Sequence, residues 1–114
     1  MYGAVNRRSP TGGNALIVVS GHLRIAPEKI EALRPHARRT LEATRQEQGC
    51  ILYAFAEDLL DPGLIRIVER WSDWPSLEAH GGRPHMDAWR AALKEVGVLD
   101  REVIAHETGE ERAL

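Results

Sequence analysis

Five histidines are the side chains of this 114-residue chain that are best suited to proton transfer or metal binding. A neutral imidazole takes or gives a proton near neutral pH, which suits a general base. His80 stands directly before Gly81-Gly82, and backbone slack of this kind often borders a pocket. Two interpretations of His80 stay open: a proton acceptor in a pocket, or a core-edge histidine satisfied by one backbone hydrogen bond.

The other histidines carry weaker signals. His22 interrupts an apolar strand pattern, and we favour a core-edge role over contact with a substrate. His80 and His85 are separated by two glycines and a proline, so they do not share a face of one continuous helix. No carboxylate and histidine show the spacing of a zinc-binding helix, and we therefore expect no metal site.

Aromatic side chains are the second group with functional potential. Trp71, Trp74 and Trp89, together with Tyr53 and Phe55, can line a pocket for a flat aromatic ligand or fill a small core. The core is the better interpretation for Trp89, and a pocket wall is plausible for Trp71. The alternation of the strand also makes Tyr53 a candidate for a dimer interface.

Other chemistries lack their motifs. The chain has no G-x-G-x-x-G, no phosphate-binding loop and no G-x-S-x-G. Cys50 begins an apolar strand pattern, where a structural role is a stronger interpretation than thiol chemistry. Arg66 and Arg70 share a strand face and can orient an anionic ligand, although pairing with acidic residues across a sheet is more common.

Length and composition predict one small domain, because 114 residues leave little room for a second core. Fifteen Lys and Arg against seventeen Asp and Glu, without runs of one sign, argue against nucleic-acid or anionic-membrane binding. No apolar stretch approaches the roughly 20 residues of a membrane-spanning helix. The single cysteine excludes an intramolecular disulfide, and no signal peptide is evident. We therefore expect a cytoplasmic protein.

The elements that must position these residues follow from the hydrophobic pattern. Residues 1–14 form an arm, residues 15–107 the domain and residues 108–114 a charged tail. The domain is predicted to contain strands at 15–25, 50–57, 64–71 and 100–106, and helices at 28–48, 74–80 and from Pro84 onward. Gly49 is expected to close the first helix in a left-handed conformation. The order β-α-β-β-α-β predicts an α+β, ferredoxin-like fold.

Such a sheet has one face covered by its helices. We expect the other face to be apolar as well, with six residues on it: Ile17, Val19, Ile51, Tyr53, Ile65 and Ile67. A second apolar face must be buried against a partner, and another copy of the chain is the simplest partner. The pattern therefore predicts a homodimer that associates through the sheet face.

Several motifs, in this order, resemble the antibiotic biosynthesis monooxygenase (ABM) domain family. They are Gly49-Cys50, the Asp61-Pro62-Gly63 turn, Glu69-Arg70-Trp71, Ala79-His80 and Pro84-His85-Met86. The resemblance covers roughly residues 16–106 and implies a ferredoxin-like protomer that dimerises into an α+β barrel.

The family includes quinol and anthrone monooxygenases, which oxidise electron-rich aromatics with O2 and usually need no metal, flavin or other cofactor. The resemblance implies that His80 is the proton acceptor or phenol partner, and that Trp71 is a pocket wall. His22 and Arg66 are our additions from strand geometry, and His85 and Trp89 complete the predicted substrate-binding set.

Two departures from related proteins are visible. Polyketide-oxygenating members use an asparagine near the pocket, whereas Asn6 and Asn14 both lie in the arm. Haem-degrading relatives use a histidine inside the last helix, and residues 86–96 contain none.

Two hypotheses stand: a cofactor-independent monooxygenase, and a non-catalytic ligand-binding or stress-associated dimer. A pocket lined by Trp71 and His80 favours the first, and a pocket filled by Trp71, Trp89 and Leu93 favours the second.

Overall fold

The computed structural model describes residues 15–114, so the predicted arm lies outside the described part of the chain. Its elements in chain order are β1 (Ile17–Ile25), a 3-10 turn η1 (Pro27–Lys29), α1 (Ile30–Thr44), β2 (Cys50–Glu57), β3 (Leu64–Trp71), α2 (Trp74–Gly81), α3 (Pro84–Val96) and β4 (Val98–Glu107).

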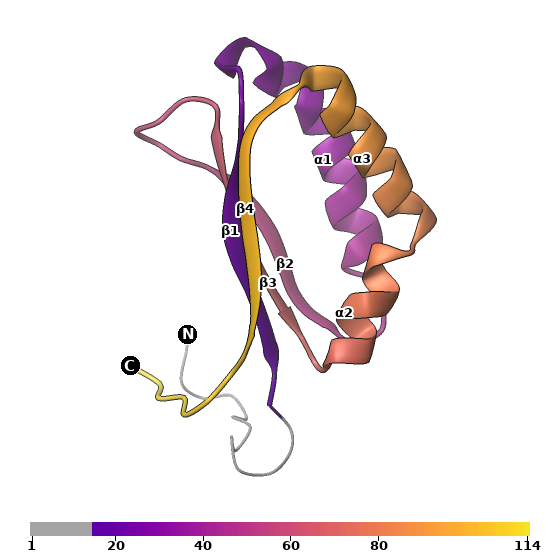
Figure 1. Ribbon diagram of the computed structural model, residues 1–114, viewed down its shortest axis with the longest axis vertical. Helices are drawn as coiled ribbons and strands as arrows, with labels where there is room; N and C mark the ends of the chain where they lie inside the picture. Colours follow the sequence, from indigo (N-terminus) through magenta and orange to yellow (C-terminus); the bar gives the residue numbers. More distant parts are fainter. Residues whose placement is uncertain (1–14) are drawn as a thin grey trace.

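The four strands form one antiparallel sheet in the order β2-β3-β1-β4. All three α-helices cover the same face of this sheet, and the opposite face is free of helices (Figure 1). This arrangement is the ferredoxin-like α+β fold, with the second helix of the pattern divided into α2 and α3. The fold class predicted from the sequence is confirmed.

The helical face of the sheet holds the hydrophobic core. Ile17, Val19, Ile65, Ile67 and Tyr53 are buried there, none of them more than 7% exposed. The prediction that these five residues belong to a second apolar face was therefore wrong, whereas the sixth predicted residue, Ile51, is 50% exposed. Alternation along a strand separates its residues into two sets but does not tell which set the helices cover.

The open face of the sheet mixes charged and apolar side chains. His22 pairs with Asp100 at 2.9 Å, Arg66 lies 3.3 Å from the carboxylate of Asp58, and Arg24 makes two hydrogen bonds to Asp61. Three exposed apolar residues lie on the same face: Leu52, Val68 and Ile104.

Several element boundaries differ from the expectation. The first long helix ends at Thr44 rather than near residue 48, and a turn over residues 45–49 connects it to β2. Gly49 has the expected positive φ of 85°, although it closes this turn rather than the helix itself. The last strand begins at Val98, two residues before the predicted start. Strands β2 and β3 have the predicted bounds.

Across residues 15–114, no helix combines the length and apolar character that crossing a bilayer requires.

Gly21 lies where β1 and β4 approach each other closely. A Cβ at this position would stand 2.7 Å from the Cα of Val103 and still closer to the carbonyl oxygen of Glu102. Both neighbours are backbone atoms that cannot rotate away. The glycine is therefore required by the packing of the edge strand.

We predict that Gly21→Ala lowers the free energy of unfolding by about 1–3 kcal/mol, the usual cost of overpacking. Urea denaturation measures this, with Gly109→Ala as the control because a Cβ there meets no atom within 4 Å. Equal stability of the two variants would show that β4 is not held tightly against β1.

Candidate active site

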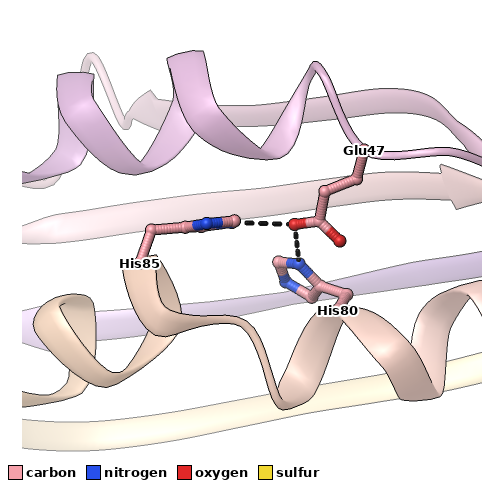
Figure 2. A group of neighbouring side chains, drawn as sticks. All are labelled: Glu47, His80 and His85. Atoms are coloured by element: carbon pink, nitrogen blue, oxygen red, sulfur yellow. Dashed lines mark hydrogen bonds and ion pairs between the residues drawn. The ribbon is translucent and has the colours of Figure 1, made fainter.

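The buried carboxylate of Glu47 joins two histidines from different helices (Figure 2). Its Oε2 atom accepts hydrogen bonds from His80 Nδ1 and His85 Nε2, each at 2.8 Å. The side chains of Glu47 and His80 are only 5% and 7% exposed. A carboxylate has acceptors alone, so both imidazoles must donate an N–H to it.

Local backbone structure brings these three groups together. Glu47 stands in the turn after α1, where its N–H donates to the Thr44 carbonyl and its own carbonyl accepts from the Cys50 N–H. His80 is in the last turn of α2, and His85 is in the first turn of α3. Between them, Arg83 adopts an extended conformation with ψ of 145°, which redirects the chain. The side chains of His80 and His85 therefore converge on Glu47, which they could not do from one continuous helix.

Aromatic rings hold the His80 imidazole in place. The Trp71 ring centroid lies 4.8 Å and that of Tyr53 lies 5.2 Å from the imidazole centroid. Trp71 is fully buried, and its Nε1 donates a hydrogen bond of 2.8 Å to Glu69 Oε1. His80 is thus fixed through Nδ1 and by packing, while no residue of the described chain is hydrogen-bonded to its Nε2.

Burial also raises the pKa of two side chains near His80, those of Glu69 and Tyr53. The pKa of Glu69 is raised, chiefly because burial disfavours the charged carboxylate, although the Trp71 hydrogen bond acts in the opposite direction. Burial likewise raises the pKa of the Tyr53 phenol, which the nearby Glu69 charge reinforces. Tyr53 therefore stays protonated near neutral pH and is not a base.

A cavity of about 680 Å³ opens beside His80, between the sheet and helices α2 and α3. This volume falls within the range of small-molecule sites. Its walls are mainly apolar and aromatic, and they include Tyr53, Phe55, Met86, Trp89 and Leu93. Four charged side chains also line it: Glu69, Arg90, Lys94 and Arg101.

A second cavity, of about 470 Å³, lies between α1 and the β2 edge of the sheet. Its polar lining consists of Arg34, Arg38, Arg45, Glu42 and Glu57. Arg34 is already paired with Glu57 at 2.8 Å, and no imidazole reaches this space. A third cavity, of about 550 Å³, has His36 and His85 in its lining. The cavity beside His80 differs from it because its imidazole is anchored to a buried carboxylate and packed between aromatic rings.

The predicted site residues divide into two sets. His80 and Trp89 line the cavity, and His85 reaches it only through the shared Glu47. Trp71 is not a pocket wall as expected, because it is fully buried and packs behind His80. His22 and Arg66 lie on the open face of the sheet, where each is paired with an aspartate, so the structure does not bring them together with His80.

Sequence reasoning missed Glu47, Glu69 and Arg101. Glu47 stands in the polar segment Gln46-Glu47-Gln48, which looks like a solvated helix end. Glu69 had an available signal, since it alternates with Ile67 and Trp71 onto the buried side of β3. Among residues 15–114, Glu47, His80 and His85 form the single group of three or more potential ligands close enough to hold a metal ion, and no spacing in the sequence indicates it.

Comparison with known proteins assigns the chain to a family and supports its fold. The family model for antibiotic biosynthesis monooxygenases matches residues 16–92. The chain belongs to this family. The match includes His80, His85 and Glu47 together with the whole of β1, β2 and β3.

Individual relatives agree with this assignment. A solved structure from Deinococcus radiodurans, provisionally named an antibiotic biosynthesis monooxygenase, is 34% identical with a TM-score of 0.78, covering 84% of this chain and 95% of that one. Rv0793 of Mycobacterium tuberculosis is 27% identical with a TM-score of 0.75, covering 84% and 97%.

Two further relatives match this chain in a comparison of sequences. YcnE of Bacillus subtilis, provisionally named a monooxygenase, is 24% identical over 83% of this chain and 100% of its own length. The Synechocystis protein sll1783 is 31% identical over 65% of this chain, but the match spans only 50% of that protein.

Proposed function

We propose that the protein is a cofactor-independent monooxygenase that oxidises a quinol, anthrone or similar electron-rich aromatic with O2. His80 accepts the proton of the substrate in this proposal. The supporting observation is the imidazole itself, which is anchored through Nδ1 to a buried carboxylate while it lines an apolar cavity.

The Glu47 hydrogen bond selects the tautomer that a base requires. Because Nδ1 of His80 donates to Glu47, the neutral ring carries its proton there and leaves the Nε2 lone pair free. When Nε2 takes a proton, the buried carboxylate stabilises the resulting imidazolium, as in other base–orienter pairs. Glu47 is thus a positioning residue, and His80 is the catalytic residue.

The charges around the cavity favour an anion inside it. Arg90, Lys94 and Arg101 contribute three positive charges to its lining, against the single carboxyl of Glu69. Arg90 is also paired with Asp87 at 3.2 Å, so Lys94 and Arg101 provide most of the surplus. Burial raises the pKa of that carboxyl, which disfavours its charged form. An enolate or phenolate formed in the cavity is stabilised by this surplus of positive charge.

The reaction balances without a further reductant. Deprotonation of an anthrone-like CH2 group gives an anion, which transfers one electron to O2 and recombines with superoxide to form a carbon–oxygen bond. Loss of water from the resulting peroxide leaves a carbonyl, so one oxygen atom enters the product and the other leaves as water. The protein's part is to bind the flat substrate, accept the first proton and stabilise the anion.

We predict that His80→Ala lowers kcat for oxygen uptake with the best quinol or anthrone of a small panel by about 10²- to 10⁴-fold, the usual contribution of a general base. An oxygen electrode measures uptake above the autoxidation blank. His36→Ala is the matched control, because His36 lies on α1 and is not part of the lining of this cavity.

Full activity in the His80 variant would show that His80 is not the base, although the protein would still be a monooxygenase. Absence of uptake throughout the panel would favour the ligand-binding alternative. Quenching of Trp89 fluorescence by the same compounds then tests that alternative, since this indole lines the cavity.

We also propose that two copies associate through the open faces of their sheets. Exposed Leu52, Val68 and Ile104 lie on this face. The β2–β3 connection, with the almost fully exposed Leu59 and Leu60, projects on the same side, away from the helices (Figure 1). A two-fold axis would bury these apolar groups against one another.

The test of this dimer is sedimentation equilibrium at micromolar concentration. We predict a dimer for the native chain and dissociation of Val68→Asp, which puts a charge in the interface but stands at an exposed position that tolerates it in the monomer. A monomeric native protein would contradict the proposal.

A further inference from the structure

We propose that Glu47, His80 and His85 also form a binding site for a divalent first-row transition-metal ion such as Zn²⁺. Each residue offers one ligand atom, and the three atoms lie within 4.8 Å of one another. Two imidazoles and one carboxylate are a ligand set that zinc and neighbouring transition metals accept.

The present distances are close to those of a coordinated ion. With metal–ligand bonds of about 2.0–2.1 Å, ligand atoms that are neighbours around an ion stand about 2.9–3.4 Å apart. Glu47 Oε2 is 2.8 Å from both histidine nitrogens. The two histidine nitrogens are farther apart, although within 4.8 Å of each other. The partly exposed His85 ring would therefore move toward His80 as an ion replaces the two N–H protons.

An unsatisfied acceptor gives a second reason. The side chain of Glu47 is only 5% exposed, and its Oε1 atom is buried without a hydrogen-bond partner. A buried acceptor without a partner is costly, and a metal ion bound by both oxygens of the carboxylate would satisfy it. The nearest cation is Arg83, whose Nε is 3.5 Å from Oε1. Because the Arg83 side chain is 45% exposed, it can turn toward solvent when an ion enters.

The site also has a route to solvent. The His85 side chain is 23% exposed, so an ion and its water ligands can reach the cluster from that side. Three protein ligands leave at least one position for water, as in sites that are not purely structural.

Metal binding and the proposed base function exclude each other, and this consequence rests on the proposed function. A metal ion on Nδ1 of His80 takes the lone pair at that atom, so the neutral ring must carry its proton on Nε2. The nitrogen that faces the cavity then donates instead of accepting. A bound ion would therefore inhibit proton abstraction.

The test is calorimetric titration of Zn²⁺ into the untagged protein after dialysis against a chelator. We expect saturation at one Zn²⁺ per chain and a visible ligand-field spectrum when Co²⁺ replaces Zn²⁺. Glu47→Gln and His85→Gln are each expected to weaken binding by at least about tenfold. His106→Gln, at an exposed histidine remote from the cluster, is expected to bind as the native protein does.

Absence of saturable binding, or binding that both ligand variants retain, would overturn the metal site. Circular dichroism of the two variants shows whether they remain folded, and the partly exposed His85 makes its variant the safer of the two. These measurements use no substrate. Failure of the metal site therefore leaves the oxygenase proposal untouched, and failure of the oxygenase proposal leaves the Zn²⁺ titration valid.

Discussion

The buried carboxylate of Glu47 determines the geometry of the site. It accepts hydrogen bonds from two imidazoles that belong to different helices, and a buried carboxylate is stable only when such partners are present. The turn after α1, the end of α2 and the start of α3 are all held by this one group. The direction of the His80 ring follows from the hydrogen bond between this carboxylate and Nδ1.

A second buried carboxyl supports the same ring from behind. Glu69 accepts from the Trp71 indole, and that indole packs against His80. Both buried acids thus act on the imidazole, Glu47 through a direct hydrogen bond and Glu69 through the indole that packs against it. The aromatic residues that pack against His80 thus restrict the rotation of its ring.

The sequence predicted the fold well because its signals are local. The Asp61-Pro62-Gly63 turn and the alternation of β2 and β3 determine the hairpin, and the two glycines and Pro84 divide the second helix. His80 could be singled out for its place before that break. Glu47 could not, because its contacts reach residues 33 and 38 positions further along the chain and nothing in its neighbours indicates burial. The side of the sheet on which His22 and Arg66 lie was equally undetermined, since alternation does not tell which face the helices cover.

The central claim is that Glu47 fixes the His80 ring with its proton on Nδ1, and the most direct test is the tautomer itself. Long-range ¹H–¹⁵N NMR distinguishes protonated from unprotonated ring nitrogens. The account predicts a protonated Nδ1 and an unprotonated Nε2 for His80 at a pH where the ring is neutral, with loss of this preference in Glu47→Gln. A neutral His80 that carries its proton on Nε2 in the native protein would contradict it.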